Sequence, residues 1–317
     1  MKCLAISGGV GGAKLALGLS KVLSPEELTI VGNTGDDFEH LGLKICPDLD
    51  TVMYTLAELS NRDLGWGQAG ESWQFLDALE RLGGESWFRL GDRDMATHIQ
   101  RSVLLASGKS LSAATSQLCA SLGIRHPIVP MSDDVIATQV QLKSGETLAF
   151  QHYFVRDRCK PEVSGFDFAG IDAAKPSAGF VSALEDEALS AVIICPSNPF
   201  VSVDPVLNIT GIEASLKASS APVIAVSPII GGEAIKGPAA KMMTELGMPQ
   251  TALAVAEHYV GRIDGFVIDQ ADADLAEDIE RLGMQCLVTK TLMLSLEDRI
   301  HLAEACIGFA AEIERTP

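Results

Sequence analysis

The chain has 317 residues, of which 47% are hydrophobic, and this is enough to build a sizeable buried core. Its 42 acidic and 24 basic side chains leave a formal charge of −18. Such an excess of negative charge disfavours binding to nucleic acids and to anionic membrane surfaces. A small phosphorylated ligand is still compatible with it, provided that local cations or a metal ion offset the charge of the ligand.

Seven cysteines are scattered along the chain without a C-x-x-C pair. Most stand in apolar runs, as in V-I-I-C, which is typical of buried, reduced thiols. No stretch approaches the length of a transmembrane helix, and the N-terminus lacks the apolar run of a signal peptide. We therefore expect a soluble cytoplasmic protein.

The chain opens with the pattern of a strand, a helix and a second strand. The strands are predicted at Cys3 to Ser7 and Leu28 to Val31, with a helical pattern from Ala13 to Leu23 between them. Five more short apolar runs alternate with helical stretches further on. They cover residues 127–129, 191–195, 222–226, 265–268 and 286–288. This alternation predicts an α/β fold with a Rossmann-like, doubly wound and mostly parallel sheet.

Two segments depart from this alternation of short strands and helices. Residues of about 51 to 125 carry several helical patterns and all three tryptophans, which indicates a helical insertion. Alternating apolar residues then flank K-S-G-E at 143–146, as in a small antiparallel hairpin. We expect one domain over residues 1–317, with its core at about 1–50 and 127–317.

A glycine-rich loop, S-G-G-V-G-G-A-K, joins the first strand to the first helix. Gly8, Gly9, Gly11 and Gly12 would let backbone N–H groups approach a phosphate, and Lys14 would meet a phosphate or a carboxylate. A tight turn without a ligand is the alternative, because a third glycine of G-x-G-x-x-G would fall at Lys14.

Two pairs of aspartates follow the second strand. Asp36 and Asp37 stand where a dehydrogenase holds the ribose of NAD, so an NAD-dependent oxidoreductase is one candidate function. Asp48 and Asp50 lie one residue apart in C-P-D-L-D-T, before a helix-like run. One aspartate would suffice as a helix cap, and two carboxylates in a turn suit a hard cation such as Mg²⁺.

The segment W-F-R-L-G-D-R-D-M-A-T-H at 87–98 gathers alternating charges beside two aromatic rings. Its polar side chains are Arg89, Asp92, Arg93, Thr97 and His98 among others. A salt-bridged helix start would explain this pattern, and so would a site for an aromatic, phosphate-bearing ligand.

Three later loops share proline and serine, and each follows a predicted strand. They are V-P-M-S-D-D at 129–134, C-P-S-N-P-F at 195–200, and the glycine-rich run at 226–241. Loops at the carboxyl ends of parallel strands converge on the ligand crevice of an open sheet. Ser197, Asn198, Pro228, Gly231 and the pair Lys236 and Gly237 are therefore candidates for phosphate binding.

These blocks, in this order, resemble the 2-phospho-L-lactate transferase family (CofD/FbiA-like) from Ser7 to about Thr291. The blocks are G-G-V-G-G-A-K, N-T-G-D-D, C-P-D-L-D-T-V-M-Y-T-L, W-F-R-L-G-D-R-D-M-A-T-H, V-P-M-S-D-D, P-S-N-P-F-V-S-V-D-P-V-L and V-S-P-I-I-G-G-E-A-I-K-G-P-A-A-K-M-M. The resemblance implies an enzyme of coenzyme F420 biosynthesis with a Rossmann-like core, Mg²⁺ and a homodimer. The ribityl hydroxyl of 7,8-didemethyl-8-hydroxy-5-deazariboflavin (Fo) would attack a guanosine diphosphate-linked three-carbon acid and release GMP.

The resemblance also implies roles for individual residues. Asp50 and Arg89 would contact Fo, with Asp92, Arg93, Thr97 and His98 around it. Asp48 and Asp50 would hold the magnesium ion and act in catalysis. Either of them could be a metal ligand or the base that deprotonates the attacking hydroxyl. The nucleotide portion of the donor would lie on the glycine loop, Asp36 and the loops of Ser197, Asn198 and Lys236.

The acid remains open among 2-phospholactate, phosphoenolpyruvate and 3-phosphoglycerate. Cys195 also stands where many members of the family have glycine before P-S-N-P. A related family of nucleotide-binding regulators, linked to gluconeogenesis, shares the glycine loop and remains an alternative to the transferase.

Overall fold

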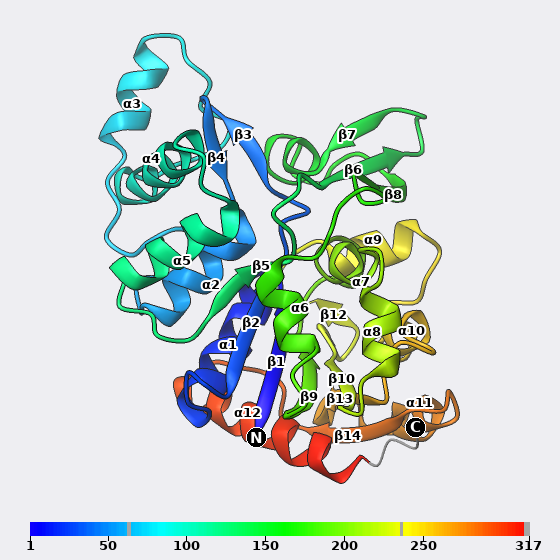
Figure 1. The fold of residues 1–317 in the computed structure, drawn as a ribbon. Coiled ribbons are helices and arrows are strands. Elements are labelled where there is room, and N and C mark those ends of the chain that lie inside the picture. The colour runs from blue at the N-terminus through cyan, green and yellow to red at the C-terminus, as the bar shows by residue number, and fades with distance from the viewer. Residues whose placement is uncertain (62–64, 235–236, 314–317) are drawn as a thin grey trace.

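The computed structural model describes residues 1–61, 65–234 and 237–313. Its centre is a sheet of seven parallel strands in the order β14-β13-β10-β9-β1-β2-β5 (Figure 1). The strands are β1 Lys2–Ser7, β2 Leu28–Gly32, β5 Ile128–Pro130, β9 Leu189–Ile194, β10 Val223–Val226, β13 Gly265–Asp269 and β14 Gln285–Thr289. Each of the seven predicted apolar runs forms one of these strands, so the doubly wound fold is confirmed.

The strands read as continuous apolar runs because the sheet is buried on both faces. Along β1, Leu4 and Ile6 point into one hydrophobic cluster, whereas Cys3 and Ala5 point into the other. This alternation is the period of two that a strand imposes on its side chains. The sheet therefore separates two cores and forms the middle layer of the molecule.

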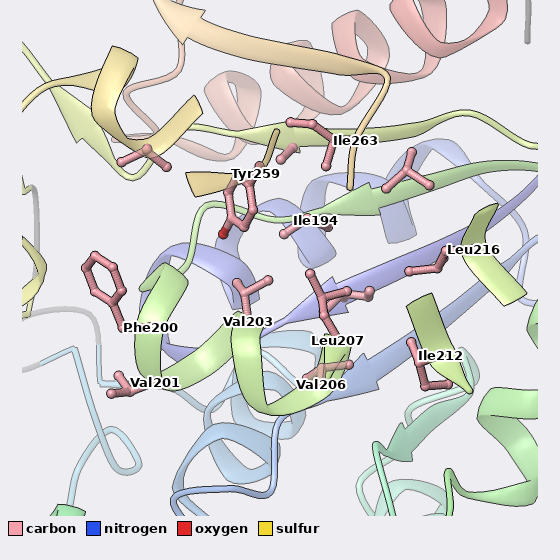
Figure 2. Packing of buried hydrophobic residues seen from close by; sticks show 14 of the residues in the cluster. Ile194, Phe200, Val201, Val203, Val206, Leu207, Ile212, Leu216, Tyr259 and Ile263 are labelled. Carbon is pink, nitrogen blue, oxygen red and sulfur yellow. The ribbon is translucent and has the colours of Figure 1, made fainter. Parts of the chain in front are cut away.

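One core lies beneath α1 (Gly9–Val22), α2 (Pro47–Leu56) and α12 (Leu296–Glu312). α1 packs against both of the other helices. The second core includes η2 (Pro199–Val203), α7 (Asp204–Leu207) and α8 (Ile212–Ala218). Figure 2 shows part of this cluster, in which Val203 and Leu207 lie close to Ile194 of β9. Both faces of the sheet are thus covered.

Further helices and strands pack in or against the second core. They are α6 (Ala178–Leu184), β11 (Ile229–Ile230), β12 (Glu233–Ala234), α9 (Ala239–Glu245), α10 (Ala252–His258), η3 (Gln270–Leu275) and α11 (Ala276–Glu280). Within the described ranges, none of the helices is long and apolar enough to cross a lipid bilayer.

Two additions stand above the carboxyl ends of the central strands (Figure 1). One contains α3 (Gln74–Arg81), α4 (Asp92–Ala106) and α5 (Leu111–Ser121), and a hairpin of β3 (Phe38–His40) and β4 (Leu43–Ile45) adjoins α4. The other is a three-stranded antiparallel sheet of β7 (Thr147–Ala149), β6 (Ala137–Leu142) and β8 (Val163–Ala169).

The predicted antiparallel hairpin is present, but its second strand is short. After β7 the chain turns into a π-helix, η1 (His152–Arg156), where alternation suggested continued strand. The hairpin β3–β4 and the third strand β8 were not predicted. Each of β3 and β4 has only three residues, too few to show a period of two.

Candidate functional site

The glycine loop is packed tightly against the loop that follows β9. A Cβ atom on Gly11 would lie 2.4 Å from the carbonyl oxygen of Pro196, and one on Gly12 would lie 2.6 Å from Oγ of Ser7. The Ser197 hydroxyl accepts a hydrogen bond from the Gly8 N–H at 3.1 Å and donates to the Gly8 carbonyl at 2.9 Å. The glycines therefore allow the two loops to approach closely, and the candidate residues Gly8 and Ser197 are in direct contact.

Asp48 lies at the N-terminus of α1 although it belongs to α2. Its Oδ1 accepts a hydrogen bond from the Gly9 N–H at 2.6 Å, and its Oδ2 accepts one from Nδ2 of Asn33 at 2.9 Å. Cys46 is the N-cap residue of α2, and it makes no side-chain cap. Asp48 thus joins the glycine loop to the end of β2, a role beyond capping of its own helix.

Asp36 completes a buried pair of carboxylates with Asp48. Its carboxylate accepts hydrogen bonds from Nδ2 of Asn33 at 3.4 Å and Nε2 of Gln151 at 3.3 Å. Burial and the negative charge of Asp48 raise the pKa of Asp36 well above its ordinary value. Burial likewise raises the pKa of Asp48 to about 6, and the bonds from Asn33 and Gly9 only partly oppose this shift.

Such an arrangement carries a physical cost that a cation would relieve. Two acidic groups are held close together away from water, and the donors on them are neutral amides. A divalent cation bound between hard oxygen ligands would lower the energy of their ionised forms. The residues present at this position therefore fit a magnesium ion.

Asp50 has different partners from Asp48. Its two carboxylate oxygens accept hydrogen bonds from both terminal nitrogens of Arg101, one of them at 3.1 Å. Arg101 is fully buried, and Nδ1 of His98 lies 3.6 Å from Oδ2 of Asp50. Burial opposes the charge of Arg101, but the attraction of Asp50 prevails, and the pKa of the guanidinium lies above its ordinary value.

This ion pair belongs to a larger polar network on α2 and α4. Nε2 of His98 lies 3.3 Å from Oδ1 of Asp94, and the Tyr54 hydroxyl donates to the same oxygen at 2.5 Å. The predicted residues Asp50 and His98 are therefore neighbours. The sequence suggested that Asp50 and Asp48 share one metal site. In the structure the carboxylate of Asp50 is paired with Arg101.

The remaining charged residues of the 87–98 segment contact the chain between residues 65 and 75. The Arg89 guanidinium lies over the Trp73 ring, 4.6 Å from its centroid. Arg93 donates to the Ala69 carbonyl at 2.9 Å, and Asp92 accepts from the Phe75 N–H at 3.1 Å. Thr97 lies 3.5 Å from Nε2 of Gln68. These contacts attach α4 to the segment before α3.

The later predicted residues divide between two loops. Asn198 caps η2 by accepting from the Phe200 N–H at 3.0 Å, while its amide lies 3.3 Å from Sδ of Met242. The Gly231 N–H donates to Asp272 at 3.0 and 3.1 Å. Pro228 and Gly237 lie in the same glycine-rich region, and Lys236 lies outside the described residues.

Lys14 of α1 points to the segment before α12. Its ammonium donates to the Met293 carbonyl at 3.0 Å, just before α12. It lines a cavity of about 200 Å³ between α1, α2 and the start of α12. The sequence analysis predicted a phosphate or a carboxylate as the partner of Lys14, and in this structure its ammonium binds a backbone carbonyl.

Three residues with prominent contacts were missed by the sequence analysis: Asn33, Arg101 and Gln151. Asn33 begins N-T-G-D-D directly after β2, so its place at a strand end was a usable signal. Arg101 and Gln151 stand in stretches without a motif. Only their tertiary positions reveal that they bind carboxylates.

Comparison with known proteins identifies the family. The family model described as 2-phospho-L-lactate transferase CofD matches residues 3–291. The chain belongs to the CofD family. Figure 1 shows that this match takes in the whole central sheet and both additions above it.

Curated relatives of similar identity carry two different names. A phosphoenolpyruvate transferase of Streptomyces avermitilis is 40% identical over 100% of both chains. One of Streptomyces griseus is 38% identical over 99% of each. A 2-phospho-L-lactate transferase of Methanosarcina acetivorans is 40% identical over 96% of this chain and 97% of its own length.

Among solved structures, a UPF0052 family protein of Bacillus halodurans has a similar fold. It aligns with a TM-score of 0.62 over 96% of this chain and 98% of that one, at 14% sequence identity. At that identity the likeness concerns the fold alone.

Proposed function

We propose that this CofD family member is a magnesium-dependent transferase of coenzyme F420 biosynthesis. The ribityl hydroxyl of Fo attacks the phosphorus that carries the three-carbon acid in a guanosine diphosphate-linked donor. A new P–O bond forms to Fo, the bond to the second phosphate breaks, and GMP leaves. The hydroxyl proton passes to a carboxylate or to water. The product is a phosphodiester of Fo and the acid.

The observation that supports this proposal best is the buried pair of Asp36 and Asp48 beside the glycine loop. In our proposal these two carboxylates hold the magnesium ion, which would offset the negative charge of the transferred phosphate. Asn33 and Gln151 orient the carboxylates through the hydrogen bonds described above. Asp50 keeps its proposed place near Fo, but its ion pair with Arg101 competes with metal binding.

The glycine loop would bind the donor through backbone N–H groups at the start of α1. Ser197 fixes this loop through its two hydrogen bonds to Gly8, so it positions the loop in our proposal. Asn198, Pro228, Gly231, Lys236 and Gly237 are proposed for the guanosine and diphosphate portions. Arg89 is proposed to contact Fo from the opposite side, together with Asp92, Arg93, Thr97 and His98.

A donor assay tests the proposal. Purified protein is incubated with Fo, Mg²⁺ and each of the lactyl, enolpyruvyl and glyceryl donors, and the products are measured by mass spectrometry. We expect GMP and one Fo phosphodiester, and no product once EDTA has removed the metal. The relatives named above support either of two acids at equal identity. A chain that forms no product with any donor would refute the transferase proposal.

A nucleotide-binding regulator of the same fold remains the second candidate function. A regulator would bind guanosine diphosphate without consuming a donor, so calorimetry run beside the donor assay distinguishes the two. We also propose a homodimer, which light scattering of the purified protein would test.

A further inference from the structure

The π-helix η2 contacts the Asp36 and Asp48 pair indirectly, through Asn33. The carbonyl of Val201 accepts a hydrogen bond from Nδ2 of Asn33 at 3.3 Å, and the same nitrogen donates to both carboxylates. Nδ2 has two hydrogens for these three acceptors, and Oδ1 of Asn33 is already held by the Gly35 N–H at 2.8 Å. The position of Val201 therefore influences how the amide is shared between the carboxylates.

The chain around η2 is also packed tightly against two loops of the site. A Cβ atom on Gly8 would lie 2.5 Å from Cβ of Ser202. One on Gly35 would lie 2.9 Å from Cβ of Pro205, the second residue of α7. At such distances η2 cannot shift without moving the glycine loop or the N-T-G-D-D turn. Contacts that fix η2 therefore also fix the surroundings of the two carboxylates.

Asp204, the first residue of α7, directly follows η2 and is held by side chains from and after α10. Nε2 of His258 lies 3.0 Å from both carboxylate oxygens of Asp204, and Nη1 of Arg262 donates to Oδ1 at 2.9 Å. Nε of Arg262 lies 2.9 Å from Oε1 of Glu213 on α8. The side chain of Asp204 is only 14% exposed, so water screens these contacts less than those of an ordinary surface ion pair.

His258 also contacts the start of η2. Its ring meets the ring of Phe200 edge to face, with centroids 5.2 Å apart. Phe200 is buried and stacks on Phe166 of β8. Figure 2 shows Phe200 and Val201 on η2. Because η2 has only five residues, its own hydrogen bonds hold it weakly, and contacts at both of its ends matter for its position.

We propose that Asp204 is a positioning residue for the transferase. Its contacts with His258 and Arg262 fix η2, and the Val201 carbonyl on η2 then orients the amide of Asn33 towards the two carboxylates. This inference rests on the proposed magnesium site. Asp204 itself touches neither Asn33 nor the carboxylates in this scheme, so its loss weakens Mg²⁺ binding while every proposed ligand stays in place.

The alternative is an ion pair that only stabilises the packing of α7 on α10. Removing such a pair would lower the free energy of unfolding but would leave the affinity of the folded protein for Mg²⁺ unchanged. Calorimetric titration of the purified protein with Mg²⁺ alone separates the two readings. The rise in melting temperature with added Mg²⁺ provides a second measurement.

Asp204→Asn keeps the size of the side chain and removes its charge. We expect Mg²⁺ binding to weaken by at least about fivefold, less than the loss typical for a group that bonds a metal ligand directly. Turnover at saturating Mg²⁺ should return to within about twofold of wild type. The control is Asp186→Asn, which removes an ion pair with Lys2 at 2.5 Å, near the starts of β9 and β1. It should leave the Mg²⁺ affinity within about twofold of wild type.

Two variants of His258 separate its hydrogen bonds from its ring contact. His258→Gln retains a donor for Asp204 and loses the ring that meets Phe200. His258→Phe retains a ring and loses the donor. We expect His258→Phe to weaken Mg²⁺ binding by at least about threefold and His258→Gln to stay within about twofold of wild type, because the contact with Asp204 fixes η2.

Unchanged Mg²⁺ affinity in both Asp204→Asn and His258→Phe would overturn the proposal. An equal or larger loss in His258→Gln would also overturn it, since the ring contact would then hold η2. Wild-type protein that binds Mg²⁺ but forms no product, with the affinity lost in the two variants, would support the role of Asp204 and refute the transferase. Wild-type protein that binds no Mg²⁺ would refute both this role and the proposed metal site.

Discussion

Asp48 and Asp50 lie two positions apart on α2, yet their surroundings differ in charge. Asp48 is bound by the Gly9 N–H and the Asn33 amide, next to the second carboxylate of Asp36. Asp50 is bound by the fully buried guanidinium of Arg101. The first cluster is acidic and held by neutral donors, whereas the second contains its own cation. A metal ion would therefore balance the negative charge of the first cluster, whereas the second cluster already contains a balancing cation.

Removing the cation of the second cluster should have the largest effect. Arg101→Leu leaves Asp50 buried without its main partner, so we expect a loss of about 3–5 kcal/mol in the free energy of unfolding. Denaturant unfolding measures this loss. The double variant Asp50→Leu with Arg101→Leu is the matched control and should recover most of the stability. An Arg101→Leu variant as stable as wild type would show that Asp50 does not need this cation.

Removing one charge of the first cluster should affect turnover instead. Asp48→Asn keeps the size of the side chain but removes a proposed metal ligand. We expect a loss of at least ~10²-fold in turnover, typical for a charge-stabilising group at a transfer site. The free energy of unfolding without metal should fall by less than about 1 kcal/mol, because burial already disfavours the ionised carboxylate.

The stabilisation of Asp48→Asn by Mg²⁺ provides a readout that is independent of activity. Wild-type protein should show a rise in melting temperature with added Mg²⁺, and the variant should show little or none. A variant with wild-type turnover at limiting Mg²⁺ would remove Asp48 from the metal site.

Arg89→Ala tests the part of the helical addition that is proposed to bind Fo. We expect Fo binding to weaken by about 1–3 kcal/mol if the guanidinium contributes a charge-assisted contact. Fluorescence titration measures the affinity. Arg81→Ala, in the last turn of α3, is a control on the same addition and should have no effect. Equal affinity of Arg89→Ala and wild type would exclude Arg89 from the acceptor site.

Gln151→Met has the smallest expected effect, and it tests whether the hydrogen bond from Gln151 orients Asp36 in the first cluster. The change removes the amide that donates to Asp36 while it preserves much of the side-chain volume. We expect about 1 kcal/mol weaker binding of Mg²⁺, since one orienting hydrogen bond is lost. Calorimetric titration with Mg²⁺ tests this. Undiminished affinity would show that Asn33 alone suffices to orient Asp36.

Much of the fold could be predicted from the sequence because parallel strands buried on both faces are short apolar runs. Six of the seven central strands have this property, and β14 at the sheet edge is only partly buried. The ends of all seven strands differ from the predicted runs by only one or two residues. The β3–β4 hairpin escaped prediction because its turn, at Leu41 and Gly42, has positive φ angles but no strong turn dipeptide.

The candidate site was predictable only at the level of loops. The glycine loop and Ser197 follow strands that lie side by side, so their proximity follows from topology. The separation of Asp48 and Asp50 into two clusters does not follow from the strand topology. It depends on the orientation of α2 and on Arg101 and Gln151, which stand 51 and 115 positions from the aspartates they bind.

The two hydrogen bonds between Ser197 and Gly8 join positions 189 residues apart. β1 likewise pairs with β9, so one edge of this first strand stays unpaired during translation until a partner more than 180 residues further along has been synthesised. During synthesis that edge is exposed to pairing with other chains. The glycine loop can therefore reach its final form only after more than half of the polypeptide has been translated.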